Sequence, residues 1–227
     1  EGNKYEGHTL IDILKKFQNR FKLESKPIVV ADRGMLTSAN IAYLENNHYT
    51  YILAYKIKNI SKEREDENWY FRTFLKGYDI KNLDSIVHKL FKHVSEAIDC
   101  TSCGNCCKKM QPNLKKKDID KLSRSLNITP DQFIIKYVDK DEDGDRILNQ
   151  LPCPFLKDNK CSQYDSRPID CASYPHLHKK DFVFRLIGVV NNYSICPIVF
   201  NVYEGLKRKL KSEFIEFRED FGEFEYY

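Results

Sequence analysis

The sequence lacks several features that would assign it to a common functional class. None of its 227 residues lie in an apolar run approaching the roughly 18 to 20 residues of a membrane-spanning helix. The N-terminus has no basic region followed by an apolar one, the pattern of a signal peptide. A glycine-rich nucleotide loop and an obvious acid–base pair are also absent. We therefore expect a cytoplasmic protein without a membrane partner, and the sequence leaves open whether it is an enzyme.

Neither sign of charge is in large excess. Residues 1–61 contain nine Lys and Arg against six Asp and Glu, and residues 62–227 contain 28 against 27. Such weak net charges do not attract a polyanion, so nucleic acid is not an expected partner. An unknown protein or small molecule is the expected partner instead. We interpret the runs 115–117 and 207–209 as solvated helix faces.

Apolar residues make up 41% of the chain, which is enough for a globular protein of one or two domains. The N-terminal part shows the order helix, strand, helix, strand. Leu10 to Phe21 carries apolar residues at helical spacing, and 27–32 reads as a strand that ends in an acid. Thr37 or Ser38 can cap a helix that extends to about Asn46, and a second strand follows at 49–57.

This N-terminal segment resembles insertion-sequence transposases of the DDE class, which have an RNase H-like fold. The resemblance covers residues 1 to about 58 and rests on Glu1-Gly2-Asn3, Thr9-Leu10 and Val30-Ala31-Asp32-Arg33-Gly34-Met35, followed by Asn40 and Tyr51-Ile52. It implies that Asp32 matches the second of three metal-binding acids. The strand with the first acid and the helix with the last are absent, so we expect an inactive remnant.

A charged stretch at 61–68 reads as the junction between two domains, 1–61 and 62–227. Beyond it, apolar residues from Leu83 to Ile98 predict a helix with Asp79 as its cap. Two short helices are expected at 118–126 and 129–138, and Phe182 to Val190 is the best strand candidate. The fold class is therefore α+β: a partial α/β fragment, then a small, mostly helical, irregular domain held together by metal.

Cysteine is absent before residue 100 and then concentrated between 100 and 196. The run Cys100-x2-Cys103-x2-Cys106-Cys107 places four thiols within eight residues, a spacing that suits zinc or an iron–sulfur centre and does not decide between them. In a reducing compartment, metal ligation is favoured over disulfides. Because adjacent side chains usually diverge, at most one of Cys106 and Cys107 should share a centre with Cys100 and Cys103. The other either ligates a second ion or packs as a small buried hydrophobe.

Four more cysteines follow. Cys153 and Cys161 bracket a turn at 157–160, and Cys171 comes one short helix later. Cys196 is expected in the first turn of a helix capped by Ser194, where backbone N–H groups favour a thiolate. Eight thiols permit two four-thiolate sites, or one site with spare thiols. His176 and His178 are weaker ligand candidates, because exposed imidazole is the simpler interpretation.

The region from about Asp66 to Leu210 resembles the CxxCxxCC cysteine-cluster family (YkgJ type), whose members are described as zinc- or iron-chelating proteins. The resemblance rests on the cysteine run, on Pro152-Cys153-Pro154-Phe155-Leu156, on Cys161-x2-Tyr164-x2-Arg167-Pro168-x2-Cys171 with Tyr174-Pro175, and on Cys196-Pro197. It implies zinc or iron as cofactor, including a 4Fe–4S cluster. Flagellin lysine methylases are similar to distant members, which implies methyl transfer or redox chemistry as an alternative. Ala172 departs from the family, which often has Arg there.

Overall fold

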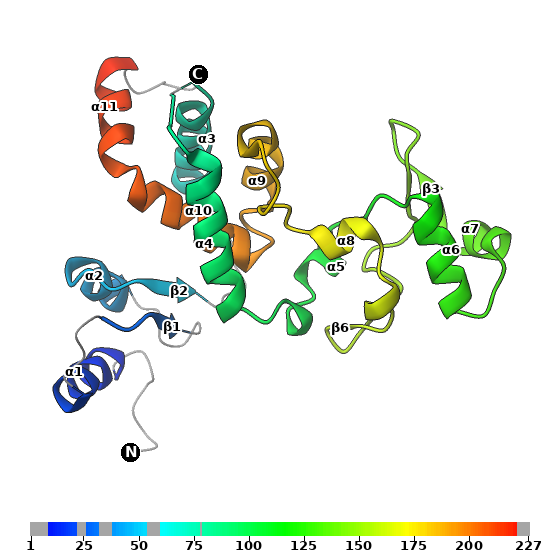
Figure 1. Ribbon diagram of the computed structural model, residues 1–227, viewed down its shortest axis with the longest axis horizontal. Coiled ribbons are helices and arrows are strands. Elements are labelled where there is room, and N and C mark those ends of the chain that lie inside the picture. Colours follow the sequence, from blue (N-terminus) through cyan, green and yellow to red (C-terminus); the bar gives the residue numbers. More distant parts are fainter. Residues whose placement is uncertain (1–8, 22–25, 32–37, 54–59, 78, 222–227) are drawn as a thin grey trace.

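The computed structural model describes residues 9–21, 26–31, 38–53, 60–77 and 79–221. Figure 1 shows an N-terminal unit beside a helical bundle, and an arm that leaves the bundle and ends in a distal lobe. The chain runs out along the arm after α4 and returns along it before α9. The cysteine-rich segments therefore lie between two bodies that have cores of their own.

The helical bundle holds the largest core. Phe71 and Phe74 on α3, Val87 on α4 and Tyr203 on α10 are completely buried in it. Gly205 lets α4 and α10 approach closely, because a Cβ there would lie 3.0 Å from Leu90 Cδ2. The bundle helices are α3 (Lys62–Gly77), α4 (Leu83–Ala97), α9 (Leu186–Asn192), α10 (Pro197–Lys209) and α11 (Lys211–Phe221), with the 3-10 turn η5 (Phe182–Arg185).

A buried ammonium group connects two of these helices. Lys207 Nζ on α10 donates to Asn68 Oδ1 at 2.6 Å and to Glu67 Oε2 at 3.0 Å, both on α3. It also lies 3.1 Å from Glu204 Oε1. The interpretation of 207–209 as a solvated face is therefore wrong at Lys207, because this side chain finds its charge partners inside the bundle.

The N-terminal unit has the expected order of elements. Its two strands are parallel, with Val29 paired to Tyr51, and Leu14 and Leu44 cover them from the helices. The guanidinium of Arg208 lies 4.9 Å from the ring centroid of Tyr51, which connects the unit to α10. Asp32 lies outside the described residues, and its role remains a prediction. The elements are α1 (Leu10–Phe21), β1 (Val29–Ala31), α2 (Ser38–Asn46) and β2 (Tyr51–Leu53).

The distal lobe is a helical hairpin followed by a β-hairpin. Thr129 and Gln132 form the capping box of α7, which confirms the predicted start of that helix. Leu122, Phe133 and Leu148 are buried in the small core between these elements. The elements are α6 (Lys116–Ser125), α7 (Pro130–Tyr137), β3 (Val138–Lys140) and β4 (Arg146–Leu148).

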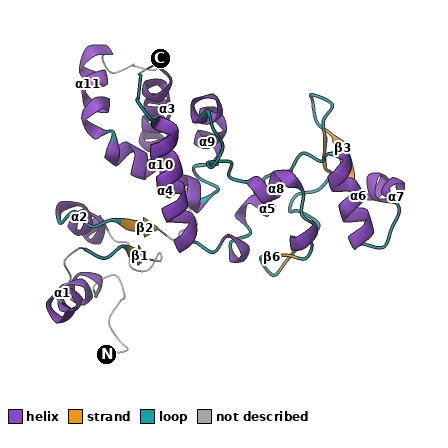
Figure 2. Cartoon of the chain, in the orientation of Figure 1, coloured by secondary structure: helices purple, strands orange, loops and turns teal. Residues whose placement is uncertain are grey.

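The arm consists of short helices and a small β-hairpin joined by loops, as Figure 2 shows. The expected hairpin between Cys153 and Cys161 is present, with Leu156 paired to Cys161. Its elements are η3 (Cys100–Ser102), α5 (Asn105–Lys109), β5 (Leu156–Lys157), β6 (Lys160–Cys161), η4 (Tyr164–Ser166) and α8 (Ile169–Ser173).

Three further sequence predictions are wrong. Phe182 to Val190 is helical rather than a strand, because Phe182, Leu186 and Val189 bury one face at helical spacing. The residue that caps α4 is Asn82 and not Asp79. Cys196, and not Ser194, is the N-cap residue of α10, so its thiol lies before the first turn. The charged stretch from Lys62 onward forms the first half of α3, and the division of the chain at 61–62 stays a prediction.

No single helix in the described part of the chain is long and apolar enough to cross a membrane. The segments Phe182–Asn192 and Pro197–Lys209 meet the length and composition requirement only as a pair, which is bent by 120°. Their buried residues belong to the bundle core.

Candidate metal centre

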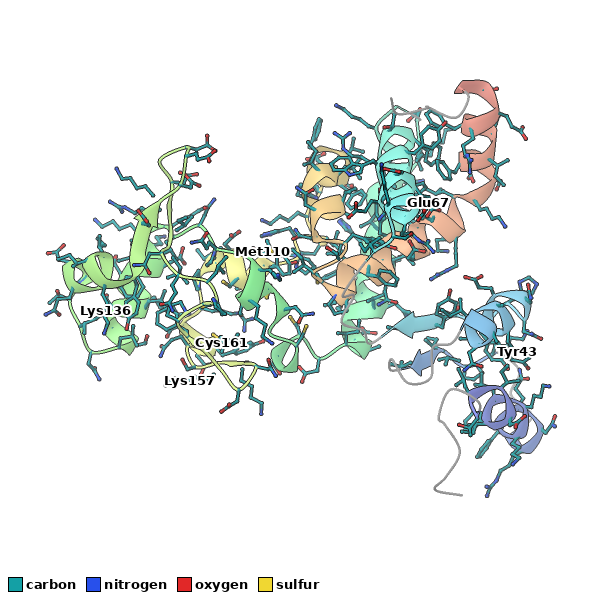
Figure 3. All side chains as sticks on the ribbon, turned by 180° about the vertical axis from the view of Figure 1, so that it is seen from behind. Tyr43, Glu67, Met110, Lys136, Lys157 and Cys161 are labelled. Carbon is teal, nitrogen blue, oxygen red and sulfur yellow. The ribbon has the colours of Figure 1, made fainter. Side chains whose placement is uncertain are left out.

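All eight cysteines lie in the described residues as free thiols, and they gather in the arm and at its attachment to the bundle. Figure 3 shows the side chains of Cys161 and Met110 in this middle region, away from Glu67 in the bundle and Lys136 in the distal lobe. Two cavities lie here, and together they are lined by every cysteine of the chain.

The smaller cavity, of about 20 Å³, lies where the arm meets the bundle. Its position depends on two local contacts. Asp99 Oδ1 accepts hydrogen bonds from Thr101 N at 2.9 Å and from Thr101 Oγ1 at 2.6 Å, which starts the turn η3. Asn105 Nδ2 donates to Ile195 O at 3.2 Å, which holds the cysteine run against the start of α10. The cysteines that line this cavity are Cys100, Cys103, Cys106 and Cys196.

The larger cavity, of about 270 Å³, lies further along the arm. The two passages of the chain are joined here, because Cys153 N donates to Cys107 O at 2.7 Å. Apolar side chains such as Phe91, Leu122 and Phe155 complete much of its wall. Its cysteines are Cys107, Cys153, Cys161 and Cys171, together with Cys100 and Cys106.

Gly104 allows the cysteine run and the β5–β6 hairpin to pack together. Its φ is +64°, a left-handed conformation that costs glycine little. A Cβ at this position would lie 3.1 Å from Asn159 O and 3.2 Å from Leu156 Cδ1. The side chain of Asn159 also accepts a hydrogen bond from Lys108 Nζ. Any larger residue at Gly104 would push the hairpin, and with it Cys161, away from the run.

Burial controls the protonation of most of these thiols. It raises the pKa of Cys153 and of Cys196 to about 11 and that of Cys171 to about 12. Cys106 and Cys107 share a hydrogen bond that raises the pKa of Cys106 and lowers that of Cys107 to about 7. Most of the free thiols are therefore protonated at neutral pH, so a metal ion must displace protons to bind them.

The donor set suits a thiophilic metal, since thiolates select zinc, Cu(I) and iron–sulfur clusters. Among the residues that the structure describes, no three His, Cys, Asp or Glu side chains are already drawn together closely enough to hold one ion. The thiols surround the cavities without converging on a point. Metal binding would therefore require them to close inward.

Arg167 and Tyr174 have no role that was predicted from the sequence. Arg167 lies on the wall of the larger cavity, and its Nη1 is buried without a hydrogen-bond partner among the described residues. Tyr174 lines both cavities, and burial, followed by the charges of Cys196 and Cys106, raises the pKa of its hydroxyl. Both residues belong to the motif around Cys171 on which the family resemblance rests, but the motif alone does not show that they line the cavities.

The two histidine candidates line neither cavity. His176 Nε2 lies 3.3 Å from Asp170 Oδ1, and the ring of His178 lies 5.9 Å from that of Phe91. Burial lowers the pKa of His176, so this imidazole is mostly neutral at pH 7. The cysteines are therefore the better candidates for ligands.

Residues 99–187 match the model of the family CxxCxxCC, described as "Putative zinc- or iron-chelating domain". The matched residues contain seven of the eight cysteines, all except Cys196. No curated protein and no solved structure matched the chain. The family match does not extend to the N-terminal unit, whose resemblance to transposases stays a prediction.

Proposed function

We propose that this protein binds zinc or iron through its cysteine thiolates. The observation that carries the proposal is that all eight cysteines, from segments far apart in the sequence, line two adjoining cavities. Cysteines kept only for packing would be distributed among the cores, yet Cys196 is the one cysteine inside a described core, and Cys153 and Cys161 only pack against the distal one. The match of residues 99–187 to a zinc- or iron-chelating domain supports the same function.

The size of the larger cavity favours an iron–sulfur centre as the second candidate. A volume of about 270 Å³ exceeds what a single ion requires. An iron–sulfur cluster held by thiolates would occupy more of it, and a redox or methyl-transfer enzyme would then be the matching class. In that case the arm residues would hold and orient the cluster, and the apolar wall would limit the access of water.

Anaerobic purification followed by metal analysis and a visible absorption spectrum tests the proposal. Colourless protein with bound zinc would indicate zinc chelation. A broad visible absorption that bleaches on reduction, with matching iron and sulfide, would indicate the cluster. Protein that retains no metal, and that takes up neither zinc nor iron on reconstitution, would refute metal binding.

A further inference from the structure

We propose that the eight thiols form two separate metal centres of four thiolates each, a division that rests on the proposed function. The first centre consists of Cys100, Cys103, Cys106 and Cys196. The second consists of Cys107, Cys153, Cys161 and Cys171. Each is a site for one thiophilic divalent ion such as Zn²⁺. The second centre lies in the larger cavity, so its four thiols must close inward to hold one ion.

The first centre follows from the smaller cavity, whose cysteines are these four and no others. Its volume of about 20 Å³ is close to that of one water-sized sphere, so it suits a single ion. Cys196 comes from the bundle, where it is the residue that precedes the first turn of α10. The hydrogen bond from Asn105 Nδ2 to Ile195 O holds it beside the cysteine run.

Cys196 lies beyond the residues that match the family model, which end at 187. The first centre therefore takes one ligand from outside the matched domain. Its neighbours support this assignment, because Cys196 lines one small cavity together with Cys100, Cys103 and Cys106. An ion bound here would connect the arm to the bundle.

The second centre follows from the remaining contacts. The backbone bond from Cys153 N to Cys107 O brings these two residues together, and the β5–β6 hairpin adds Cys161. Cys171 on α8 completes the group, because it lines the same cavity as Cys107, Cys153 and Cys161. An ion bound here would connect the outgoing and returning passages of the arm.

A single centre cannot use all eight thiols, because zinc takes four ligands in tetrahedral geometry. The division falls between Cys106 and Cys107, consecutive residues of the short helix α5, where successive side chains are about 100° apart. Their thiols share one hydrogen bond at the border of the two cavities. Two bound ions would displace the proton of this hydrogen bond and draw the two sulfurs in different directions.

Zinc stoichiometry tests the division. The full chain is stripped of metal, reconstituted anaerobically with Zn²⁺ and freed of excess ion, and zinc is then counted per chain. We expect two zinc ions for the unmodified chain and one each for Cys196→Ser and Cys171→Ser. We expect none for the double variant. Ser173→Ala, on the same helix as Cys171, is the matched control and should retain two.

The outcomes separate the division from the proposed function. One zinc per chain, or two retained by Cys196→Ser, would overturn the two-centre assignment and leave metal binding intact. No zinc in the unmodified chain would refute the function itself. Because a cysteine variant can misfold, Co²⁺ titration of the unmodified chain gives an independent measurement. Thiolate-to-cobalt absorption that stops rising at two ions supports the division, and saturation at one ion overturns it.

Discussion

The guanidinium carbon of Arg167 lies 3.7 Å from the centroid of the Tyr164 ring, so the cation is stacked on the aromatic face. This stacking fixes the charge on the wall of the larger cavity. Burial raises the pKa of Cys100 in the first proposed centre and of Cys161 in the second, and the charge of Arg167 opposes this rise at both. Four thiolates around a divalent ion leave a net charge of about −2, which this cation partly offsets.

Arg167→Gln should therefore weaken zinc binding by roughly tenfold, the lower end of the range for residues that support metal ligands. Competition with a chromophoric chelator measures the change. Arg167→Lys should recover part of the affinity, because it restores the charge without the planar stack. Arg124→Gln, at an exposed position on α6, is the control. Equal affinity in Arg167→Gln and the unmodified chain would show that the cation does not support the centres.

Lys207→Met should destabilise the bundle by about 2–3 kcal/mol, because it leaves Glu67, Glu204 and the Asn68 amide oxygen without their buried cation. The estimate is below that for a fully buried pair, since the Glu67 side chain is 40% exposed. Urea unfolding followed by circular dichroism measures the difference. The exposed Lys209→Met on the same helix should change stability by less than about 0.5 kcal/mol. Equal effects in the two variants would contradict a specific role for Lys207.

Asp84 at the start of α4 should make a pH-dependent contribution to stability. Burial alone would raise the pKa of its carboxyl, but hydrogen bonds from Phe182 N at 2.9 Å and Asp181 N at 2.6 Å outweigh it and lower the pKa. The carboxylate therefore stabilises the fold fully above its ordinary pKa of 3.8, and this contribution is lost as the pH falls through the lower folded-state value.

Asp84→Asn should accordingly cost about 1 kcal/mol at pH 7, since hydrogen bonds to a partly exposed carboxylate are weakened by solvent. The difference between variant and unmodified chain should shrink as the pH is lowered below 3.8. Urea unfolding of both proteins across this range tests the sign. A difference that grows in acid would contradict it.

Local signals predicted much of the fold. Thr129 and Pro130 begin α7, and alternating turn and apolar residues gave the β5–β6 hairpin, because these elements depend on neighbours within a few residues. The prediction for Phe182 to Val190 was wrong for a tertiary reason. Its aromatic and β-branched residues favour a strand, but packing against the bundle requires one buried helical face. Lys207 was misread in the same way, since its partners on α3 lie about 140 residues earlier.

For the candidate site too, the sequence predicted local features and missed those that depend on distant contacts. The cysteine spacing gave the ligand candidates, and the assignment of Cys106 and Cys107 to different centres stays a prediction. The spacing does not show that Cys196 lies beside the cysteine run. The hydrogen bond that holds them together joins Asn105 to Ile195, which are 90 residues apart. Arg167 was visible in the sequence as part of a pattern, but its stacking on Tyr164 depends on the 3-10 turn between them.

Metal removal should loosen the arm and leave the bundle folded. The core around Phe71, Phe74 and Val87 draws on contacts between α3, α4 and α10 that involve no proposed ligand except Cys196. The segments around 100–107 and 153–171 have only short turns, so metal ligation should supply much of their stability. Hydrogen exchange before and after verified chelation should therefore rise in these two segments, with little change in α3 and α10. Unchanged exchange in the arm would contradict a stabilising role for the metal, and loss of protection throughout the bundle would show that its core depends on the metal as well.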